Sequence, residues 1–335
     1  MPVAAGLLAL ALAVSAPGPT VLFTLPPVLS EVSGMAYGAS GTLFVHQDSG
    51  SAATLTALTG DGEVRASYDL GVQARDWEDL AAGPRGTLLV ADIGDNRGVR
   101  DLGVLVHRIS EPIGPSGPTA PPESIRLRYA DAPQDAETLL VHPTTGQTLV
   151  VTKGLLGSTV YAAPQPLTAG TLRAVATVPV TSTDTEGGPA GIAGVGDRLV
   201  TGGAVSADGR RLVVRTYTDA YIFRVPGEDL VAAFDEDPVV VPLPPTAQGE
   251  AVTWTPDGSA LVTASEGTAT PVQRVPVPEP DVAPQPDGFP QPGPPAAGPA
   301  ATGSGIPVAP WLLGGGSVLA VLLVTARWSA RRRRR

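Results

Sequence analysis

Cysteine is absent from this chain of 335 residues. Its absence excludes disulfide bonds, thiol catalysis, zinc–thiolate sites and a lipidated N-terminal cysteine. Histidine is scarce as well, and the three histidines, His46, His107 and His142, share no spacing typical of a metal site. No G-x-S-x-G motif is present, so a Ser-His-Asp triad has no motif to support it.

Amphipathic helices are also missing between residues 21 and 275. Apolar residues come instead in short alternating or β-branched runs, which Gly, Pro, Asp and Thr separate. This pattern predicts an all-β domain. At roughly 250 residues, such a domain is large enough for a core that needs no disulfide.

Five stretches of this domain repeat one pattern. Each begins with a polar or acidic residue, passes through small and apolar residues to a turn ending in glycine, and continues into a short apolar strand. The stretches are 33–48, 78–92, 137–153, 201–217 and 250–266, and their turn glycines are Gly41, Gly86, Gly146, Gly209 and Gly258. Glycine supplies the positive φ that a tight hairpin turn demands.

The repeat predicts a β-propeller of five or six blades over residues 21–275. Five copies in register favour it over the alternative, a β-sandwich with incidental hairpins. A sixth blade would lie around residues 181–196, where the spacing is longest. The segment 20–28 would supply the strand that closes the ring with the last blade.

The two ends of the chain have the patterns of targeting and anchoring segments. Residues 1–16 form an Ala/Leu/Val run that is typical of a signal peptide, with an uncleaved anchor as the alternative. Residues 308–326 are apolar or small throughout, and the arginines of the 327–335 tail follow, which predicts a membrane-spanning helix with a cytoplasmic C-terminus. The proline-rich stretch 276–307 predicts an extended stalk.

These segments predict an exported protein held at the cell membrane, with the propeller outside. The tract PAATGSG (299–305) resembles a degenerate sorting signal of Gram-positive cell walls, and its use would make the protein wall-linked instead. The formal charge is −10 although six arginines belong to the C-terminal end. An outer domain this acidic favours cations and disfavours nucleic acid as partners. We expect a monomer that binds an unidentified extracellular ligand or protein.

The repeat predicts where the acidic residues gather. In a propeller, the start of each inner strand and the end of the next strand converge on the mouth of the central channel. Counting back from the turn glycines gives Ser33, Glu78, Glu137, Thr201 and Glu250. Counting forward gives Asp48, Asp92, Lys153, Arg215 and Glu266. Because crowded carboxylates repel one another, and because oxygen ligands without thiolate suit hard cations, we expect Ca²⁺ at this mouth.

Two sets of residues are therefore candidates. The expected metal ligands are Glu78, Asp79, Asp92, Asp95, Glu137 and Glu250. The expected ligand-binding residues are Asp48, Lys153, Arg215, Tyr217 and Glu266. Asp95 lies in the tract DIGDN, which lacks EF-hand spacing and can equally form an Asx turn. Cross-strand packing is an equal alternative for Arg215 and Tyr217, and we expect Trp77 and Trp254 in the core.

Two stretches resemble blades of the phytase-like and six-bladed propeller superfamily, GEAVTWTPDGSALVTASEG (249–267) and DAETLLVHPTTGQTLVVTKG (135–154). DWEDLA with ADIGDN resembles a group of exported, C-terminally anchored actinobacterial propellers. In the β-propeller phytases the mouth binds several Ca²⁺ ions and phosphate esters. The resemblance thus implies metal ligands at Glu78, Asp79, Asp92, Glu137 and Glu250, and phosphate contacts at Lys153 and Arg215. The chain lacks the tandem-Asp entry motif and the dense basic patch of the phytases, which counts against a phosphatase.

Three functions remain open on the sequence. The first is a cell-surface propeller that binds Ca²⁺ and a ligand or partner at its acidic mouth. The second is a phytase-like, Ca²⁺-dependent hydrolase of phosphate or carboxylic esters at the same mouth. The third is a structural scaffold whose acidic residues only keep one face solvated.

Overall fold

The computed structural model describes residues 18–48, 52–189 and 196–278. The expected signal peptide (1–16), most of the expected stalk (276–307), the expected membrane helix (308–326) and the tail (327–335) lie outside these residues. Among the residues described, none of the helices has the length and apolarity that a bilayer span requires.

The strands of the described residues form five antiparallel groups of four. Blade 1 contains β2 (Val32–Tyr37), β3 (Leu43–Gln47), β4 (Thr54–Leu58) and β5 (Val64–Asp69). Blade 2 contains β6 (Trp77–Gly83), β7 (Thr87–Asp92), β8 (Val104–Ser110) and β10 (Glu123–Tyr129). Blade 3 contains β11 (Ala136–Val141), β12 (Thr148–Thr152), β13 (Ser158–Ala162) and β14 (Gly170–Val178).

The last two blades complete the set. Blade 4 contains β15 (Val200–Val205), β16 (Arg211–Thr216), β17 (Asp219–Arg224) and β18 (Val239–Pro242), with the short 3₁₀ helices η1 (Pro226–Glu228) and η2 (Ala232–Asp235) before β18. Blade 5 contains β19 (Gly249–Trp254), β20 (Ala260–Ser265), β21 (Pro271–Pro276) and, from the start of the chain, β1 (Thr20–Thr24).

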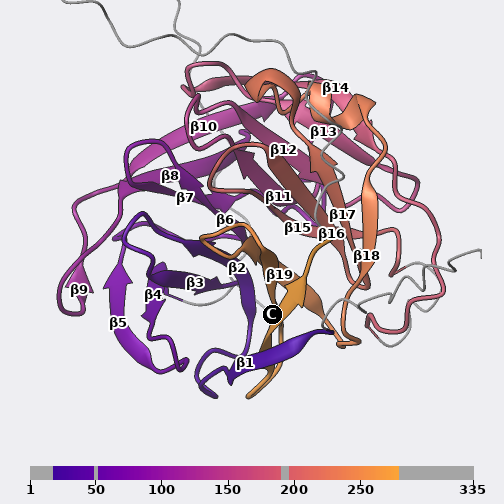
Figure 1. The fold of residues 1–335 in the computed structure, drawn as a ribbon. Coiled ribbons are helices and arrows are strands. Elements are labelled where there is room, and N and C mark those ends of the chain that lie inside the picture. The colour runs from indigo at the N-terminus through magenta and orange to yellow at the C-terminus, as the bar shows by residue number, and fades with distance from the viewer. Residues whose placement is uncertain (1–17, 49–51, 190–195, 279–335) are drawn as a thin grey trace, which may run out of the picture. The chain divides into compact units, whose positions relative to one another are not determined.

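The innermost strands form a closed ring. Each of β2, β6, β11, β15 and β19 packs against the next, and β19 packs against β2. Figure 1 shows these strands around a common centre, with β1, β5, β10, β14 and β18 at the periphery. The fold is therefore a β-propeller, as the repeat predicts, and the described chain makes five blades. In the stretch 181–196, where a sixth blade was expected as an alternative, the described residues 181–189 and 196 contain no strand.

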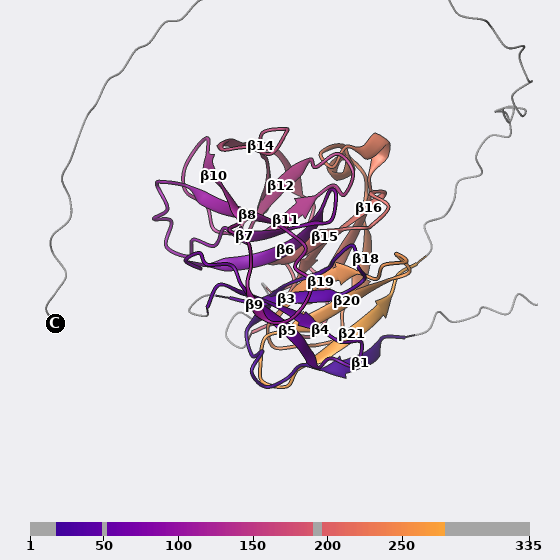
Figure 2. The same cartoon turned by 90° about the vertical axis from the view of Figure 1, so that its left-hand side faces the viewer.

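Blade 5 closes the ring with strands from both ends of the domain. Thr20 pairs with Arg274 and Thr24 pairs with Pro271, and Figure 2 shows β1 alongside β21. The closing strand predicted in segment 20–28 is thus confirmed. Because Pro276 pairs with Ala260, next to the turn of the inner hairpin, the chain leaves the propeller on the face of the hairpin turns. We call this the turn face and the opposite one the mouth face.

The hairpin turns have the geometry that the repeat predicts. All five turn glycines have positive φ, between 67° and 79°. Neighbouring turns also interlock: Pro84 covers Gly146 of the next blade, and His142 covers Gly209 of the blade after that. A side chain at Gly209 would approach the His142 ring to 2.6 Å. Glycine here permits both the turn and the close contact between blades.

Two outer contacts link particular blades. Strand β10 pairs in parallel with β14, so that blades 2 and 3 form one eight-stranded sheet. The short strand β9 (Gly117–Pro118), between β8 and β10, pairs in parallel with β5 of blade 1. Apolar clusters fill the spaces between successive sheets. Trp77 and Trp254 are both buried in these clusters, as predicted.

A chain that begins after β1, at residue 26, is expected to lose its closing strand and the buried Leu25. Its melting temperature should fall by about 10 °C, since a loss of a few kcal/mol shifts a domain of this size by that amount. Differential scanning calorimetry measures this. A chain that ends at residue 278 keeps every strand described, and it should unfold cooperatively at an unchanged temperature. An unchanged melt after loss of β1 would contradict the closure.

The acidic mouth as candidate functional site

A β-bulge lies near the start of every inner strand. The pairing with the second strand skips Ser33 in β2, Glu78 in β6, Glu137 in β11 and Thr201 in β15. In β19 it skips Glu250 together with Ala251. A bulge turns one extra side chain away from the regular alternation of its strand. The residues that counting back from the turn glycines singles out are these bulge residues, so the structure confirms that they share one position in all blades.

The five bulge residues divide into two kinds. On blades 1 and 4, the Ser33 hydroxyl donates to the Glu78 carbonyl at 2.6 Å and the Thr201 hydroxyl donates to the Gly249 carbonyl at 2.9 Å. Each thus bonds its blade to the next one in the ring. The other three blades carry glutamate at this position, and those side chains are buried around the channel.

The bulge glutamates raise one another's pKa. Burial raises the pKa of Glu78 well above its ordinary value, and the charge of Glu137 raises it further. Burial likewise raises the pKa of Glu250, and Glu137 and then Glu266 add to the shift. Buried carboxylates of like charge favour protonation, so these glutamates keep their protons to a higher pH than exposed glutamates do.

Asp48, Asp76 and Glu78 form the tightest acidic group in the described chain. Each offers a carboxylate oxygen, and these oxygens lie within 4.8 Å of one another. Burial, followed by the charge of Asp48, raises the pKa of Asp76 to about 6. A side chain at Gly94 would collide with the carboxylates of Glu78 and Asp76, so this glycine makes room for both. Three converging carboxylates are a donor set that suits a hard divalent cation.

Lys153, which the sequence predicts at the mouth, contacts the bulge glutamate of its own blade, Glu137. Its Nζ is 2.8 Å from Oε1 of Glu137 and 5.2 Å from the centre of the Tyr217 ring. Although burial lowers the pKa of Lys153, Glu137 and Tyr217 raise it well above its ordinary value, which keeps the ammonium charged. Oε2 of Glu137 is buried and has no hydrogen-bond partner among the described residues. That oxygen remains available as an acceptor or a metal ligand.

Glu250 and Glu266 form a second pair of carboxyls at the mouth. Gln248 Nε2 donates to Oε2 of Glu266. Burial raises the pKa of Glu266, and the charge of Asp48 adds to this effect. Burial and then the charge of Glu137 raise the pKa of Glu250, and the charge of Glu266 raises it further. These carboxyls therefore keep their protons to a higher pH than isolated glutamates do.

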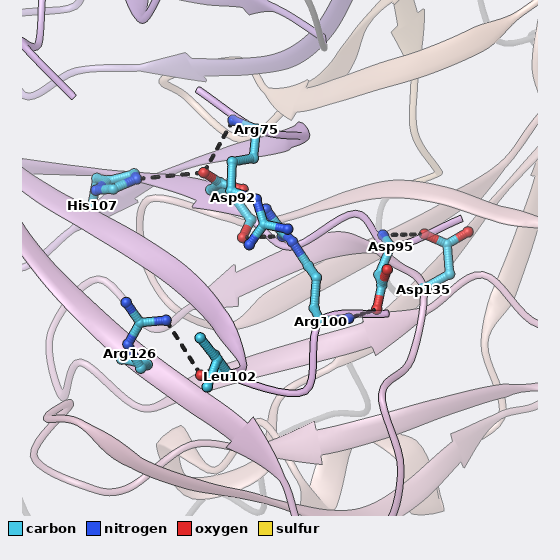
Figure 3. A network of polar contacts seen from close by, with 8 residues as sticks. All are labelled: Arg75, Asp92, Asp95, Arg100, Leu102, His107, Arg126 and Asp135. Atoms are coloured by element: carbon cyan, nitrogen blue, oxygen red, sulfur yellow. Dashed lines mark hydrogen bonds and ion pairs between the residues drawn. The ribbon is translucent and has the colours of Figure 1, made fainter. Parts of the chain in front are cut away.

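Asp92 belongs to a separate buried network, shown in Figure 3. Arg100 pairs with its carboxylate and also donates from Nη1 to its carbonyl at 2.7 Å. The backbone N–H of Arg75 donates to Oδ2 at 3.3 Å. Burial alone would raise the pKa of Asp92, but the His107 ring, whose Nε2 is 3.8 Å from Oδ2, and the Arg100 guanidinium hold it below its ordinary value. Arg100 and the Arg75 backbone thus engage the carboxylate that the sequence predicts to be a metal ligand.

Asp95 stabilises the loop after β7. Its carboxylate accepts the backbone N–H groups of Val99 and Arg100 at 2.9 and 2.8 Å. Its own N–H donates to Oδ1 of Asp135 at 2.7 Å, as Figure 3 shows. These bonds form the Asx-type turn that was the alternative prediction for the tract DIGDN.

Asp79 bonds blade 2 to blade 3. Its Oδ1 accepts the N–H of Leu80, and its Oδ2 accepts the N–H of Leu139 in blade 3, both at 2.8 Å. Its acceptors are occupied by backbone donors, so it does not join the Asp48, Asp76 and Glu78 group.

Arg215, which the sequence predicts either to contact a ligand or to pack between strands, donates to backbone carbonyls. Its guanidinium is buried, and it donates to the carbonyls of Thr216, Ala251 and Ala264 at 3.1, 2.8 and 3.2 Å. Burial lowers the pKa of Arg215 to about 10. A side chain at Gly249 would collide with the guanidinium. Arg215 therefore fixes blade 4 to blade 5 and leaves its donors with backbone partners.

The mouth also contains a residue that counting from the turns missed. Asp76 precedes β6 and therefore lies outside the repeat. It stands two residues before Glu78, and in an extended chain residues two apart point to the same side. The period-two relation in the tract DWE was the signal that could have found it.

Arg215→Ala should lower the free energy of unfolding by about 3 kcal/mol or more, because several buried carbonyls lose their donor. Arg224→Ala is the matched control, since Arg224 is exposed on the neighbouring strand β17; it should change stability by about 0.5 kcal/mol or less. Urea unfolding measures both. A ligand-binding role without a structural one would leave Arg215→Ala as stable as the control.

The raised carboxylate pKa values predict an unusual pH dependence without divalent cations. A raised pKa gives stability that is full below the unfolded-state value and is lost as pH rises through the folded-state value. For Asp76 that loss runs from about pH 4 to about pH 6, and for Glu137, whose pKa burial raises to about 7, it continues to about pH 7. The melting temperature should therefore fall between about pH 4 and about pH 7. His46, whose pKa burial lowers to about 4, acts in the opposite direction. In Glu78→Gln the melting temperature should depend less on pH. A pH dependence as steep as that of the wild type would contradict a role of the mouth carboxylates in it.

Comparison with known proteins adds little about chemistry. No family model matches the sequence, and no curated protein matches it. Among solved structures, a gluconolactonase from Xanthomonas campestris is 16% identical, with a TM-score of 0.41, over 74% of this chain and 72% of that one. The PQQ-bound form of an aldose sugar dehydrogenase from Streptomyces coelicolor is 11% identical, with a TM-score of 0.44, over 77% of this chain and 97% of that one. Likenesses of this degree carry no argument about the reaction or the ligand of this chain.

Proposed function

We propose that this protein is a cell-surface propeller that binds a divalent cation, Ca²⁺ in the first place, at its acidic mouth and uses the bound cation to hold a ligand. The observation that carries the proposal is the group of Asp48, Asp76 and Glu78, whose oxygens converge within 4.8 Å. The donor set contains only carboxylates, which suits Ca²⁺ better than softer metals.

Electrostatics supports the same assignment. Asp76 and Glu78 both have raised pKa values, for which burial and neighbouring carboxylates are responsible. A divalent cation would relieve the repulsion between them, and it would lower both pKa values. Lys153 is paired with Glu137 and also lowers the pKa of Glu250, whereas the charges named for Glu78 are all those of other acids.

The surroundings of the cation group supply ligand contacts. Lys153 offers a positive charge, Tyr217 an aromatic ring at 5.2 Å from that charge, and Glu137 an acceptor oxygen without a partner in the described structure. The cation itself would hold a carbonyl, carboxylate or phosphate oxygen. We place this mouth outside the cell, on the pattern of the segments at 1–16 and 308–326.

Calorimetric titration with Ca²⁺ tests the cation site. Asp76→Asn should weaken binding about tenfold or more, because it removes one of three charged ligands. Asp257→Asn is the matched control, since it removes the same charge from a turn on the opposite face; its affinity should stay within about twofold. Lowering the pH from 7.5 to 5.5 should weaken binding to the wild type, because Asp76 must lose a proton of pKa about 6. Equal losses in both variants would contradict a site at the mouth.

A second candidate function is hydrolysis of an ester at the same mouth. The observation that favours it is the pair of Glu250 and Glu266, because burial raises both pKa values and the charge of Glu266 raises that of Glu250 further. A divalent cation at the mouth would polarise the carbonyl or phosphoryl oxygen for attack by water. A protonated carboxyl of the pair would give its proton to the leaving group, and the attacking water would return one.

A panel of carboxylic and phosphoric esters, with and without Ca²⁺, separates the two candidates. Turnover that requires Ca²⁺ and falls about a hundredfold in Glu250→Gln supports the hydrolase. Calcium binding without turnover of any ester supports the binding protein alone. A structural scaffold would show neither binding nor turnover.

A further inference from the structure

Beside the mouth, a tight turn exposes two leucines. The turn joins β12 to β13 through Lys153, Gly154, Leu155, Leu156 and Gly157. The Gly157 N–H donates to the Gly154 carbonyl at 3.2 Å, and a side chain at Gly154 would collide with the Gly157 carbonyl. The glycines therefore fix a turn whose tip projects outward. Leu155 is 63% exposed there and Leu156 is fully exposed.

Leucine at such a tip is unfavourable unless something covers it. Hairpin tips normally carry Asn, Asp, Gly or Ser. Burial of a leucine side chain is worth about 1.5–3 kcal/mol, and two adjacent leucines forgo this gain. Adjacent exposed leucines in a defined turn indicate a contact surface more strongly than scattered apolar residues do.

A neighbouring loop has the same character. In blade 2, the connection from β7 to β8 exposes Val99 and Leu102, at 61% and 69%. This connection occupies the same place in its blade as the leucine turn does in blade 3, on the mouth face. Two adjacent blades therefore present apolar side chains on the face that carries the acidic mouth.

The leucine turn begins at a charged residue of the mouth. Lys153 starts the turn and directs its ammonium to Glu137, whereas Leu155 and Leu156 follow at once and point into solvent. A ligand that lies across this turn meets a polar, charged surface at one end and an apolar surface at the other. The carboxylates of the mouth would repel an anionic head group unless a cation were bound beside them.

We propose that the ligand of the mouth is an amphiphilic anion, whose charged head lies at the cation and Lys153 and whose apolar chain lies against Leu155 and Leu156. This inference rests on the proposed function, because the cation is needed to attract the head. It commits to a single dissolved molecule instead of a bilayer. The described chain ends on the turn face, which is opposite to the face that carries the leucines.

Octanoate and acetate are the probes, and titration calorimetry measures them on residues 18–278, which contain every strand of the closed ring. With Ca²⁺ present, octanoate should bind about tenfold or more tightly than acetate, because its chain covers leucine surface. Without Ca²⁺, octanoate binding should be lost. The double variant Leu155→Ser/Leu156→Ser should bind octanoate no better than acetate and should keep its affinity for Ca²⁺. Ile113→Ser, which removes an apolar residue equally exposed in another loop, should change none of these values.

Several outcomes would overturn the inference, and they are distinguishable from failure of the cation site. If Ca²⁺ binds but octanoate and acetate bind alike, the apolar subsite is wrong and the proposed function stands. If octanoate binds equally well without Ca²⁺, the placement of the head group is wrong. If residues 18–278 sediment with phosphatidylglycerol vesicles, the double leucine variant does not, and octanoate does not bind, the leucines contact a membrane and the inference is wrong. If Ca²⁺ itself does not bind, the proposed function fails first.

Discussion

The bulge near the start of each inner strand is the constraint on which the mouth depends. Regular pairing would place successive side chains alternately toward the two neighbouring sheets, where apolar clusters pack. The skipped residue does not follow that alternation. Each of the five blades has such a residue near the start of its inner strand. Three of the positions carry glutamate, and the other two carry hydroxyl groups that bond to the next blade. The same local irregularity therefore produces both the charged lining and the bonds that hold the ring around it.

A mouth lined with buried carboxylates lowers the stability of the fold. Burial and mutual repulsion raise the pKa values of Glu78 and Glu250, and a core of apolar side chains would avoid both costs. Asp79 and Arg215 show how this chain treats buried charge that has only a structural role, because backbone groups engage both side chains. The carboxylates of Asp76 and Glu78 differ from them, since oxygens of both lie within 4.8 Å of each other and of an Asp48 oxygen. This contrast is the physical reason to regard the mouth as a site.

Much of the fold could be predicted from the sequence, because a repeated strand–turn–strand pattern is a local signal. Turn glycines such as Gly86 and Gly209 must have positive φ, and counting from them locates the bulge residues. The partners of individual side chains could not be predicted in this way. Asp92 lies at a mouth position by count, yet Arg100 and His107 reach it from the following loop and strand. Arg215 faces carbonyls of blade 5, which are distant in sequence. Contacts between blades form only when the ring closes. The pattern of strands and turns along the sequence does not predict which side chains then meet.

The joining of β10 to β14 makes the two sides of the mouth different. Glu78 and Glu137 come from the two blades that this pairing unites in one sheet, so backbone hydrogen bonds as well as packed side chains connect their blades. Glu250 and Glu266 come from the blade whose outer strand is supplied by the opposite end of the domain. Separation of that outer strand would therefore act first on the side of Glu250 and leave the sheet of Glu78 and Glu137 intact.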